Sequence, residues 1–598
     1  MKRRQLLQAG LTLPFSSLLL GATGSDSRRA APRSRVRPGD PGWPTPAKWS
    51  RLKERVGGNL IDSHGLFESC VSQPQGAECL DARNHIRNPY WIGDQPGGTQ
   101  VSGWLGAWQP EPSVYTIKAR HAADVAAGVN FARENNLRLV VKGGAHSYLG
   151  TSNAPDSLLI WTRAMNSIVH HEKFVGRGCE GRVEPVPAVS AGAGAVWMDL
   201  YNAVTTEGGR YVQGGGCTTV GVAGHIQSGG FGSFSKGFGT ASAALLEAEV
   251  VTADGHVRVV NACNDPELFW ALKGGGGGTF GVVTRVTVRT YELPNRFGAA
   301  WGLVAAHTDD GYKRLIARTL EFYRDKLFNP HWGEQIKFGP RNTLDLSMVC
   351  QGLDNDQANR IWQPFFNELQ SSGDLTVIRP PGCGAWDSRH WWNVDGPSMN
   401  RDTREGAPQN RSWWKDDEGQ VGAFIHGYDS LWLSASLLQG DPRSLLAEAL
   451  FAASRHKEVS LHFNKGLGGA PEAARKDALD TAMNPGAVDA FALAIIADGE
   501  GPAYPGFTST PVNVEAARND ARDIEMAAAE LRRVAPNAGS YVSESNYFNQ
   551  SWQDAYWGSH YSRLQAVKAK YDRDGLFFVH HGVGSEDWSA DGFTRIRS

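Results

Sequence analysis

Two glycine-rich turns, each presenting one reactive side chain, constrain this sequence more than any other feature. The first, Val141-Lys-Gly-Gly-Ala-His-Ser-Tyr148, places His146 shortly after two glycines. The second, Gly214-Gly-Gly-Cys-Thr-Thr-Val-Gly221, places Cys217 directly after three. Glycine lets the main chain approach a ligand closely and adopt turns that other residues resist. The two turns therefore predict a site where backbone N–H groups and two nucleophiles surround one ligand.

Glycine runs recur along the same part of the chain. Besides Gly143-Gly144 and 214–216, the sequence contains Gly229-Gly230 and the run 274–278, each close to a predicted strand. Successive backbone amides can bind a pyrophosphate without a cluster of lysines. The strand–Gly-x-Gly-x-x-Gly–helix opening of a dinucleotide-binding Rossmann unit is absent from the sequence. The glycine runs favour a different kind of nucleotide-cofactor site.

An imidazole and a thiolate can both add to an oxidised isoalloxazine ring. His146 and Cys217 therefore predict a flavin held by two covalent bonds, and hence a redox enzyme. Each residue also has a simpler interpretation, His146 as a hydrogen-bonded turn histidine and Cys217 as a disulfide partner or buried thiol. The occurrence of both turns in one chain favours the flavin.

Size and charge narrow the class of protein. A chain of 598 residues predicts two or more packed domains. The 60 basic and 62 acidic residues nearly balance, and no basic stripe indicates a nucleic-acid partner. No Cys or His spacing resembles a zinc site, so no metal is expected.

The seven cysteines suit an oxidising compartment. They fit three disulfides plus Cys217 as a reserved thiol. Only Cys70 with Cys79 is predicted as a pair, because a short local loop is easily closed. The pairing of the others stays open, namely Cys179, Cys263, Cys350 and Cys383.

The N-terminus is typical of an export signal. Residues 1–8 are basic, 9–21 are apolar but too short to span a bilayer, and small residues near 22–24 offer a cleavage site. Arg3-Arg4 favours a twin-arginine signal, with an ordinary secretory signal as the alternative. We expect residues 1–24 to be the signal, 25–48 a flexible linker, no membrane span, and a periplasmic or secreted protein.

The remaining chain predicts an α+β fold. In 49–294 we expect a helix over 122–135, strands at 137–141 and 280–288, and a hairpin of 247–252 with 256–260. In 295–540, strands at 297–304 and 343–349 accompany helices at 311–324 and 514–534. The end, 541–598, contains a helix at 559–571.

Several motifs, in order along nearly the whole chain, resemble the berberine-bridge-enzyme-like branch of the vanillyl-alcohol-oxidase flavoproteins. They are Asn88-Pro-Tyr-Trp-Ile-Gly-Asp94, Val141-Lys-Gly-Gly-Ala-His-Ser147, Gly215-Gly-Cys-Thr-Thr-Val-Gly-Val-Ala-Gly-His225, Phe269-Trp-Ala-Leu-Lys-Gly-Gly275, Asn546-Tyr547, Tyr561-Ser-Arg-Leu564, Lys568-Ala-Lys-Tyr-Asp572 and Gly575-Leu-Phe577. The resemblance implies a two-part PCMH-type FAD-binding domain at 49–294. It also implies a substrate domain at 295–540, with an antiparallel sheet backed by helices, and a segment at 541–598 that returns to the FAD domain.

The resemblance also implies FAD attached through His146 at position 8α and through Cys217 at position 6. It implies that Tyr547 of the Asn-Tyr motif is the general base; Glu544, three residues earlier in the sequence, is the alternative candidate. Tyrosine has a pKa near 10, so such a base needs a nearby cation or concerted hydride departure. A small residue at Val220, near the family's oxygen access, resembles the oxidases. Further cofactor contacts are expected at Gly143, Gly144, Ala145, Ser147, Gly215, Gly216, Gly221, Gly224, His225, Gly229, Gly230, Gly281, Val282 and Val283.

These features predict an exported oxidase of a hydroxylated small molecule. The base removes a hydroxyl proton as hydride moves to flavin N5, and O2 is reduced to H2O2. A saccharide is the first expectation and a phenolic or alkaloid-like compound the second. A dehydrogenase with a quinone or cytochrome acceptor and a flavin-free binding protein remain alternatives. The oligomeric state stays open. Six tryptophans between Trp386 and Trp432, interleaved with Arg401, Arg404 and Arg411, are either ligand platforms or ordinary packing and surface residues.

Overall fold

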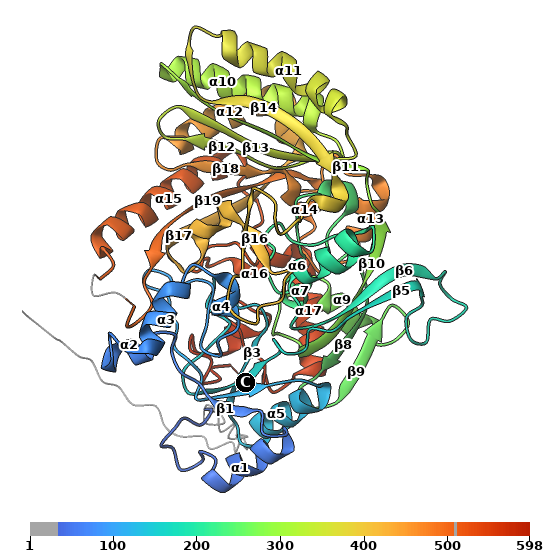
Figure 1. The fold of residues 1–598 in the computed structure, drawn as a ribbon, viewed down its shortest axis with the longest axis vertical. Helices are drawn as coiled ribbons and strands as arrows, with labels where there is room; N and C mark the ends of the chain where they lie inside the picture. Colours follow the sequence, from blue (N-terminus) through green and yellow to red (C-terminus); the bar gives the residue numbers. More distant parts are fainter. Residues whose placement is uncertain (1–33, 508–510, 598) are drawn as a thin grey trace, which may run out of the picture.

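The computed structural model describes residues 34–507 and 511–597 (Figure 1). The predicted signal at 1–24 lies outside this range. The described residues form four sheets: two smaller ones in the lower half of Figure 1, a larger one above them, and the two-stranded pair of β15 (Met399–Arg401) and β16 (Ser412–Trp414). Within the described residues no helix is long and apolar enough to cross a membrane. The same residues hold no group of three or more His, Cys, Asp or Glu side chains that could bind a metal ion.

The first sheet is four-stranded with order β1-β2-β4-β3, and its last three strands are parallel. Its strands are β1 (Leu60–Asp62), β2 (Tyr115–Lys118), β3 (Arg138–Lys142) and β4 (Ser157–Trp161). Helix α5 (Ala122–Glu134), close to the predicted 122–135, forms the crossover from β2 to β3. Its Gly128 faces Ile117 so closely that a Cβ there would lie 2.7 Å from the Ile117 side chain. Strand β3 of this sheet runs directly into the histidine turn.

The second sheet is antiparallel, with order β5-β6-β10-β8-β9 and β7 added on β10. Its strands are β5 (Ile168–Phe174), β6 (Val186–Gly192), β7 (Arg210–Val212), β8 (Leu245–Val251), β9 (Val257–Asn261) and β10 (Val282–Glu292). The predicted hairpin is confirmed as β8 and β9. Around this sheet pack α6 (Trp197–Leu200), η1 (Tyr201–Glu207), α7 (Val222–Gln227), α8 (Ser235–Phe238) and α9 (Pro266–Leu272).

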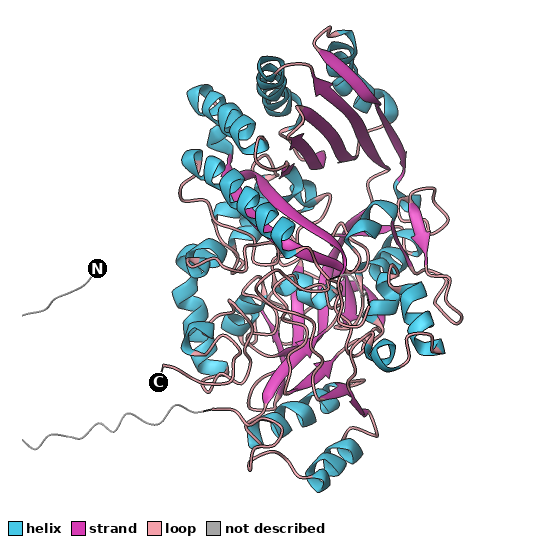
Figure 2. Cartoon of the chain, turned by 90° about the vertical axis from the view of Figure 1, so that its left-hand side faces the viewer, coloured by secondary structure: helices cyan, strands magenta, loops and turns pink. Residues whose placement is uncertain are grey.

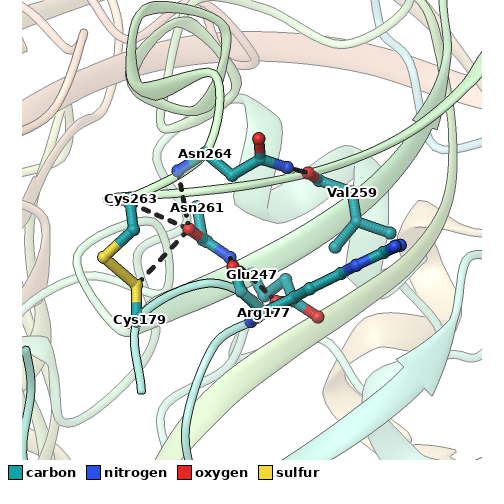
Figure 3. Close-up of a disulfide and its surroundings, with 7 residues drawn as sticks. All are labelled: Arg177, Cys179, Glu247, Val259, Asn261, Cys263 and Asn264. Atoms are coloured by element: carbon teal, nitrogen blue, oxygen red, sulfur yellow. Dashed lines mark hydrogen bonds between the residues drawn. A yellow bond between two sulfur atoms is a disulfide. The ribbon is translucent and has the colours of Figure 1, made fainter. Parts of the chain in front are cut away.

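A disulfide between Cys179 and Cys263 closes one end of this sheet (Figure 3). Beside it, the buried Asn261 side chain donates to the Glu247 carboxylate at 2.9 Å and to the carbonyl of Arg177 at 3.0 Å. The bridge and the amide together hold the loop between β5 and β6 against β8 and β9.

The third sheet is antiparallel, with order β14-β11-β13-β12-β18-β19-β17. Its strands are β11 (Arg296–Ala306), β12 (Trp332–Gly339), β13 (Thr343–Gln351), β14 (Leu375–Asp387), β17 (Ala423–Ser434), β18 (Val459–His462) and β19 (Ala490–Pro502). Four long helices share its core: α10 (Asp309–Phe322), α11 (Asn355–Ser371), α12 (Gly440–Ser454) and α15 (Val514–Val534). Figure 2 shows helices running along this upper sheet. The predicted α+β fold with an antiparallel, helix-backed sheet is confirmed.

The C-terminal segment packs into the lower half of the molecule (Figure 1). It contains α16 (Trp552–Trp557) and α17 (Tyr561–Tyr571). Its Phe577 forms a parallel bridge with Leu139 of β3, and the Lys568 ammonium donates to the carbonyl of Thr279 at 2.6 Å. The segment therefore closes over the sheets that carry the two glycine turns.

The linker prediction is wrong from residue 34 onward. Arg35 is buried, its N–H donates to the carbonyl of Phe593 at 2.9 Å, and Val36 bridges Leu137. Helix α1 (Pro46–Arg55) follows and packs Trp49 and Leu52 inward. Apolar and cationic side chains in this stretch find partners on the folded surface, which composition alone does not reveal.

One predicted disulfide is confirmed, and the prediction of three disulfides is wrong for the described chain. The predicted Cys70–Cys79 bridge is confirmed; it joins α2 (Glu68–Ser72) to α3 (Ala77–His85), just before α4 (Pro89–Gly93). A third disulfide is not formed in the described chain, since Cys350 and Cys383 are free thiols. Cys350 lies on β13 and Cys383 on β14, with β11 between those two strands. A strand of separation places the two sulfurs out of bonding reach.

Candidate active site

The histidine turn begins where β3 ends. Ala145 adopts a left-handed backbone conformation, with φ of 64°, and its carbonyl accepts from the N–H of Gln100 at 2.9 Å. Lys142, buried at the end of β3, donates to the carbonyls of Gln95 and Gly98. Burial lowers the Lys142 pKa to about 7. These contacts fix the turn and direct His146 into the interior.

The cysteine turn is fixed by hydrogen bonds that its backbone carbonyls accept from residues of α6 and η1. The N–H groups of Trp197 and Met198 donate to the carbonyls of Val220 and Thr218, at 3.1 and 2.8 Å. The Tyr201 hydroxyl donates to the carbonyl of Gly215 at 2.5 Å. The turn thus lies on α6 and η1.

The two turns cross at a pair of glycines. A Cβ on Gly144 would lie 2.6 Å from the backbone nitrogen of Gly221, and a Cβ on Gly221 would lie 2.8 Å from that of Gly144. Both distances are far below van der Waals contact, so the crossing requires glycine on both sides. It brings the histidine turn directly against the cysteine turn.

Thr219 links the two nucleophiles. Its hydroxyl lies 3.1 Å from Nε2 of His146 and 3.5 Å from Sγ of Cys217. Burial lowers the His146 pKa to about 4, so the imidazole is neutral at neutral pH. Burial also disfavours the charged form of Cys217, and it therefore raises the pKa of the thiol. A neutral imidazole is a nucleophile, whereas the thiol needs a base. Thr219 was not identified from the sequence, although it stands two residues after Cys217.

Both turns open into a cavity of about 1550 Å³ between the small sheets and the upper sheet. Among the expected cofactor contacts, most line it: Gly143, Gly144, Ala145, His146, Ser147, Gly215, Gly216, Cys217, Val220, Gly221, Gly224, His225, Gly281 and Val283. Gly229, Gly230 and Val282 do not. Gly229 and Gly230 pack on Met483 and Tyr541, and Val282, the first residue of β10, points into the core next to the first sheet.

His225 is held by protein on both ring nitrogens. Trp197 Nε1 donates to Nδ1 at 3.1 Å, and Nε2 lies 3.0 Å from the carbonyl of Phe231. Because Nδ1 accepts, Nε2 carries the proton and donates to that carbonyl. Burial lowers the His225 pKa to about 4. His225 therefore supports the cysteine turn as a neutral ring.

One end of the cavity is lined by the glycine run 276–278 and by the C-terminal segment at 579–582. Here Gln227 Oε1 and Thr279 Oγ1 are buried without a hydrogen-bond partner in the described protein. Buried polar atoms nearly always have a partner. The two orphan atoms therefore indicate that a polar ligand completes this end.

At the other end, two carboxylates and a lysine meet. Lys465 Nζ lies 2.5 Å and 2.6 Å from the Glu544 carboxylate oxygens. The Glu334 carboxylate accepts from the Ser233 hydroxyl at 2.5 Å and from the Asn464 amide at 3.3 Å. All five side chains line the cavity.

Glu334 stands out within this group. Its φ of 63° is a left-handed value that a non-glycine residue adopts at a cost, and such strain concentrates at functional sites. Burial raises the pKa of its carboxyl. Oε1 lies 3.5 Å from the point where a Cβ on Gly216 would sit, so the carboxyl reaches the cysteine turn. In the sequence, Glu334 is one polar residue of a strand, and no motif marks it as a site residue.

Tyr547 lies beside the cavity wall. Its ring stacks on His580, with centroids 3.8 Å apart, and packs 6.0 Å from Trp104. His580 lines the cavity, whereas Tyr547 is not among the lining residues. Burial raises the pKa of the Tyr547 phenol. Of the two expected base candidates, Glu544 is the one that faces the cavity.

The tryptophan cluster divides between the cavity and the core. Trp386, Trp391 and Trp414 form a row with ring centroids 6.2 and 6.1 Å apart. The row leads from Trp386, which is 49% exposed, to the cysteine turn, where Trp414 Nε1 donates to the carbonyl of Gly216 at 3.1 Å. Trp392 and Trp413 also line the cavity, while Trp432 is buried in the core.

The interleaved arginines have protein partners. Arg404 and Arg411 contact the Asp94 carboxylate at 2.8 and 2.7 Å, and Arg401 pairs with Asp395 at 3.2 Å on the surface. None of the three lines the cavity. The Arg404 and Arg411 charges therefore fasten the 395–411 loop to Asp94 at the end of α4, whereas Arg401 pairs within the loop.

Two family models match the chain, one described as FAD binding domain over residues 114–261 and one described as berberine and berberine like over 529–584. The FAD-linked oxidoreductase malF of Malbranchea aurantiaca is 30% identical over 622 residues, which cover 97% of each chain. This chain is a berberine-bridge-enzyme-like FAD-linked oxidoreductase. The first match contains both glycine turns, and the second contains Glu544 and Tyr547.

This FAD-linked oxidoreductase also resembles the VAO-type flavoprotein oxidase VAO615 of Thermothelomyces thermophilus. The two are 28% identical over 627 residues, covering 98% of this chain and 99% of the relative. The crystal structure of MtVAO615 from Myceliophthora thermophila superposes with a TM-score of 0.76 over 94% of this chain and 100% of that one, at 26% identity.

A more distant solved structure, glucooligosaccharide oxidase from Acremonium strictum, shares the fold. Its TM-score is 0.65 at 18% identity, over 89% of this chain and 99% of that one. That oxidase contains a 6-S-cysteinyl, 8α-N1-histidyl FAD. The relatives named above come from fungi.

Proposed function

We propose that this FAD-linked oxidoreductase is an exported oxidase that carries its flavin on two covalent bonds and oxidises a hydroxylated small molecule. The observation that supports this most directly is the contact of one hydroxyl with both nucleophiles. Thr219 Oγ1 lies 3.1 Å from His146 and 3.5 Å from Cys217, at the wall of the large cavity.

The described residues fit FAD. The Gly144–Gly221 crossing holds the two nucleophile-bearing turns together at the cavity, and the run 276–278 lines the same cavity. Gln227 Oε1 and Thr279 Oγ1 are buried polar atoms that lack a protein partner. Backbone N–H groups in such concave turns bind pyrophosphate. His146 and Cys217 would hold the ring, and Gln227 and Thr279 would bond its polar groups.

When bound, FAD supplies the acceptor for the hydride that leaves the substrate. The chain itself has to take the hydroxyl proton, and we assign this to Glu544. Glu544 lines the cavity, and the Lys465 ammonium at 2.5 and 2.6 Å from its carboxylate oxygens holds this proton acceptor in place. Tyr547, the base implied by the family resemblance, is the second candidate; its raised pKa disfavours the phenolate.

We propose a saccharide as substrate. The cavity wall combines the Trp386–Trp391–Trp414 row with polar side chains of the upper sheet, including Gln335 and Lys337. Flat aromatic faces beside hydrogen-bonding groups suit a ring that bears several hydroxyls. A phenolic or alkaloid-like compound could use the same tryptophans but would leave the polar groups unmatched, so it ranks second.

We further propose O2 as electron acceptor and a location outside the cytoplasm. Val220, a small residue of the cysteine turn, lines the cavity, which fits oxygen access. The alternative is a dehydrogenase that passes electrons to a quinone or cytochrome. Two disulfides, Cys70–Cys79 and Cys179–Cys263, fit an oxidising compartment.

Denaturing gels test the flavin bonds. Flavin fluorescence should stay on the polypeptide in the wild type, in His146→Ala and in Cys217→Ala, and leave it in the double variant. An unchanged flavin spectrum in Cys217→Ala would contradict the second bond. Colourless protein would favour the flavin-free alternative.

A peroxide-coupled screen over oligosaccharides, phenols and secondary alcohols tests the substrate class. Rapid reoxidation of the reduced protein by air is expected. Slow reoxidation by air, together with fast reoxidation by a quinone, would identify a dehydrogenase.

A further inference from the structure

The strand β16 (Ser412–Trp414) and the short helix η4 (Lys415–Gln420) cover the cysteine turn. Trp414 Nε1 donates to the carbonyl of Gly216 at 3.1 Å, and the Thr218 hydroxyl donates to the carbonyl of Ser412 at 2.9 Å. These bonds fall on the residues immediately before and after Cys217. The covering segment is therefore fixed relative to the thiol.

Asp417, in η4, faces the thiol. Its carboxyl lies near enough to the Cys217 side chain to influence the pKa of the thiol, and both residues line the cavity. Its Oδ2 is buried and has no hydrogen-bond partner in the described protein. A buried carboxylate oxygen without a donor is costly and calls for an explanation. The nearby S–H group is a proton source that this oxygen can accept from.

We propose that Asp417 is the base that takes the proton of Cys217 when the thiol bonds to FAD, so that its role lies in attaching the cofactor. This inference rests on the proposed bond between Cys217 and the flavin. Thiolate is the reactive form of cysteine, and burial opposes its formation here. A base near the sulfur removes that obstacle.

The step balances with dioxygen as oxidant. The S–H bond of Cys217 breaks and its proton moves to Asp417. The sulfur electron pair forms a C–S bond at one carbon of the flavin ring. The C–H bond at that carbon breaks, and its hydrogen leaves as a proton. The two electrons released pass to O2, which takes up two protons and becomes H2O2.

Neighbouring groups are less suited to this role. The Glu334 carboxylate already accepts from Ser233 and Asn464, and Glu544 is paired with Lys465. The Thr219 hydroxyl is too weak a base. Burial raises the Asp417 pKa to about 6, which leaves it ionised at neutral pH and closer in basicity to a thiol than an ordinary aspartate. Geometry and basicity thus point to the same residue.

The test uses protein purified with its flavin in a His146→Ala background, where only Cys217 can form the bond. The readouts are the covalent flavin fraction, by intact mass and gel fluorescence, and its growth with time in air at pH 7. We expect Asp417→Asn to slow attachment at least tenfold. Asp416→Asn, a change at the exposed neighbouring carboxylate, should attach flavin like the parent.

Two further measurements separate the loss of a base from a loss of fold. Asp417→Glu keeps a carboxylate and should restore much of the attachment. Attachment in Asp417→Asn should speed up steadily as the pH rises from 7 to 10, because hydroxide then replaces the missing base. Equal attachment in Asp417→Asn and Asp416→Asn at pH 7 would overturn the inference. A His146→Ala parent that forms no covalent bond at any pH would instead overturn the proposed attachment at Cys217.

Discussion

Gly144 and Gly221 lie so close that a Cβ on either one would overlap the backbone nitrogen of the other. This contact joins the turn that carries His146 to the turn that carries Cys217, although the two glycines are far apart in sequence. Neither glycine has a positive φ. Glycine is needed at both positions because the two backbones leave no space for a side chain. An unusual backbone conformation is not the reason.

We predict that Gly144→Ala and Gly221→Ala each destabilise the protein by about 1–3 kcal/mol, because backbone cannot move aside as a flexible side chain can. Thermal unfolding should show a lower Tm and a smaller flavin content. Gly143→Ala is the matched control, since its Cβ would meet its nearest atom, the carbonyl oxygen of Ala193, at 3.3 Å. Equal Tm losses for Gly143→Ala and Gly144→Ala would contradict a special role for the crossing.

Thr219 provides a second prediction. Thr219→Val keeps the shape of the side chain but removes the hydroxyl that contacts both nucleophiles at 3.1 and 3.5 Å. We expect a lower covalent flavin fraction in Thr219→Val and a nearly normal one in Thr219→Ser. Intact mass before and after denaturation measures that fraction. If Val and Ser behave alike, the hydroxyl does not orient the nucleophiles.

Much of this architecture is predictable because it depends on local pattern. Helix α15 (Val514–Val534) matches the predicted 514–534, and the β8–β9 hairpin lies where Asp254-Gly255 indicates a turn. The glycine turns are predictable for the same reason, since a run of glycines beside a nucleophile is visible in the sequence itself.

What could not be predicted depends on contacts between distant segments. Glu334, Lys465 and Glu544 come from three separate parts of the chain, and only the fold brings them to one wall of the cavity. Asp417 reaches Cys217 across 200 positions of sequence. Cys350 and Cys383 fail to pair because β11 lies between their strands, which no cysteine count reveals.

The base assignment gives a third prediction. Glu544→Gln removes the carboxylate that Lys465 holds, and we expect turnover to fall by about 10²–10⁴-fold. Tyr547→Phe, which removes a phenol outside the cavity lining, should lower turnover by less than about tenfold. The flavin spectrum of both variants should stay intact, which separates chemistry from cofactor loss. If Tyr547→Phe lowers turnover more than Glu544→Gln does, the base is Tyr547 and not Glu544.

His225 makes the fold sensitive to acid. Its pKa is about 4 in the folded protein, because burial disfavours the charged ring, against about 6.5 in an unfolded chain. Between these values the unfolded state binds the extra proton, so stability is complete above pH 6.5 and falls as the pH drops toward 4. The loss approaches about 3 kcal/mol. Protonation at Nδ1 would also break the bond donated by Trp197.

We therefore predict that the thermal unfolding temperature declines between pH 6.5 and 4 and that His225→Gln flattens this decline, though its Tm at pH 7 is lower. Burial also lowers the pKa values of His462, His580 and His581, so these rings add to the decline in the same direction and contribute to the slope that remains. His64→Gln, at a largely exposed histidine, is the control and should leave the slope unchanged. If His225→Gln keeps the full wild-type slope, the acid sensitivity arises elsewhere and the neutral ring on the cysteine turn is not its cause.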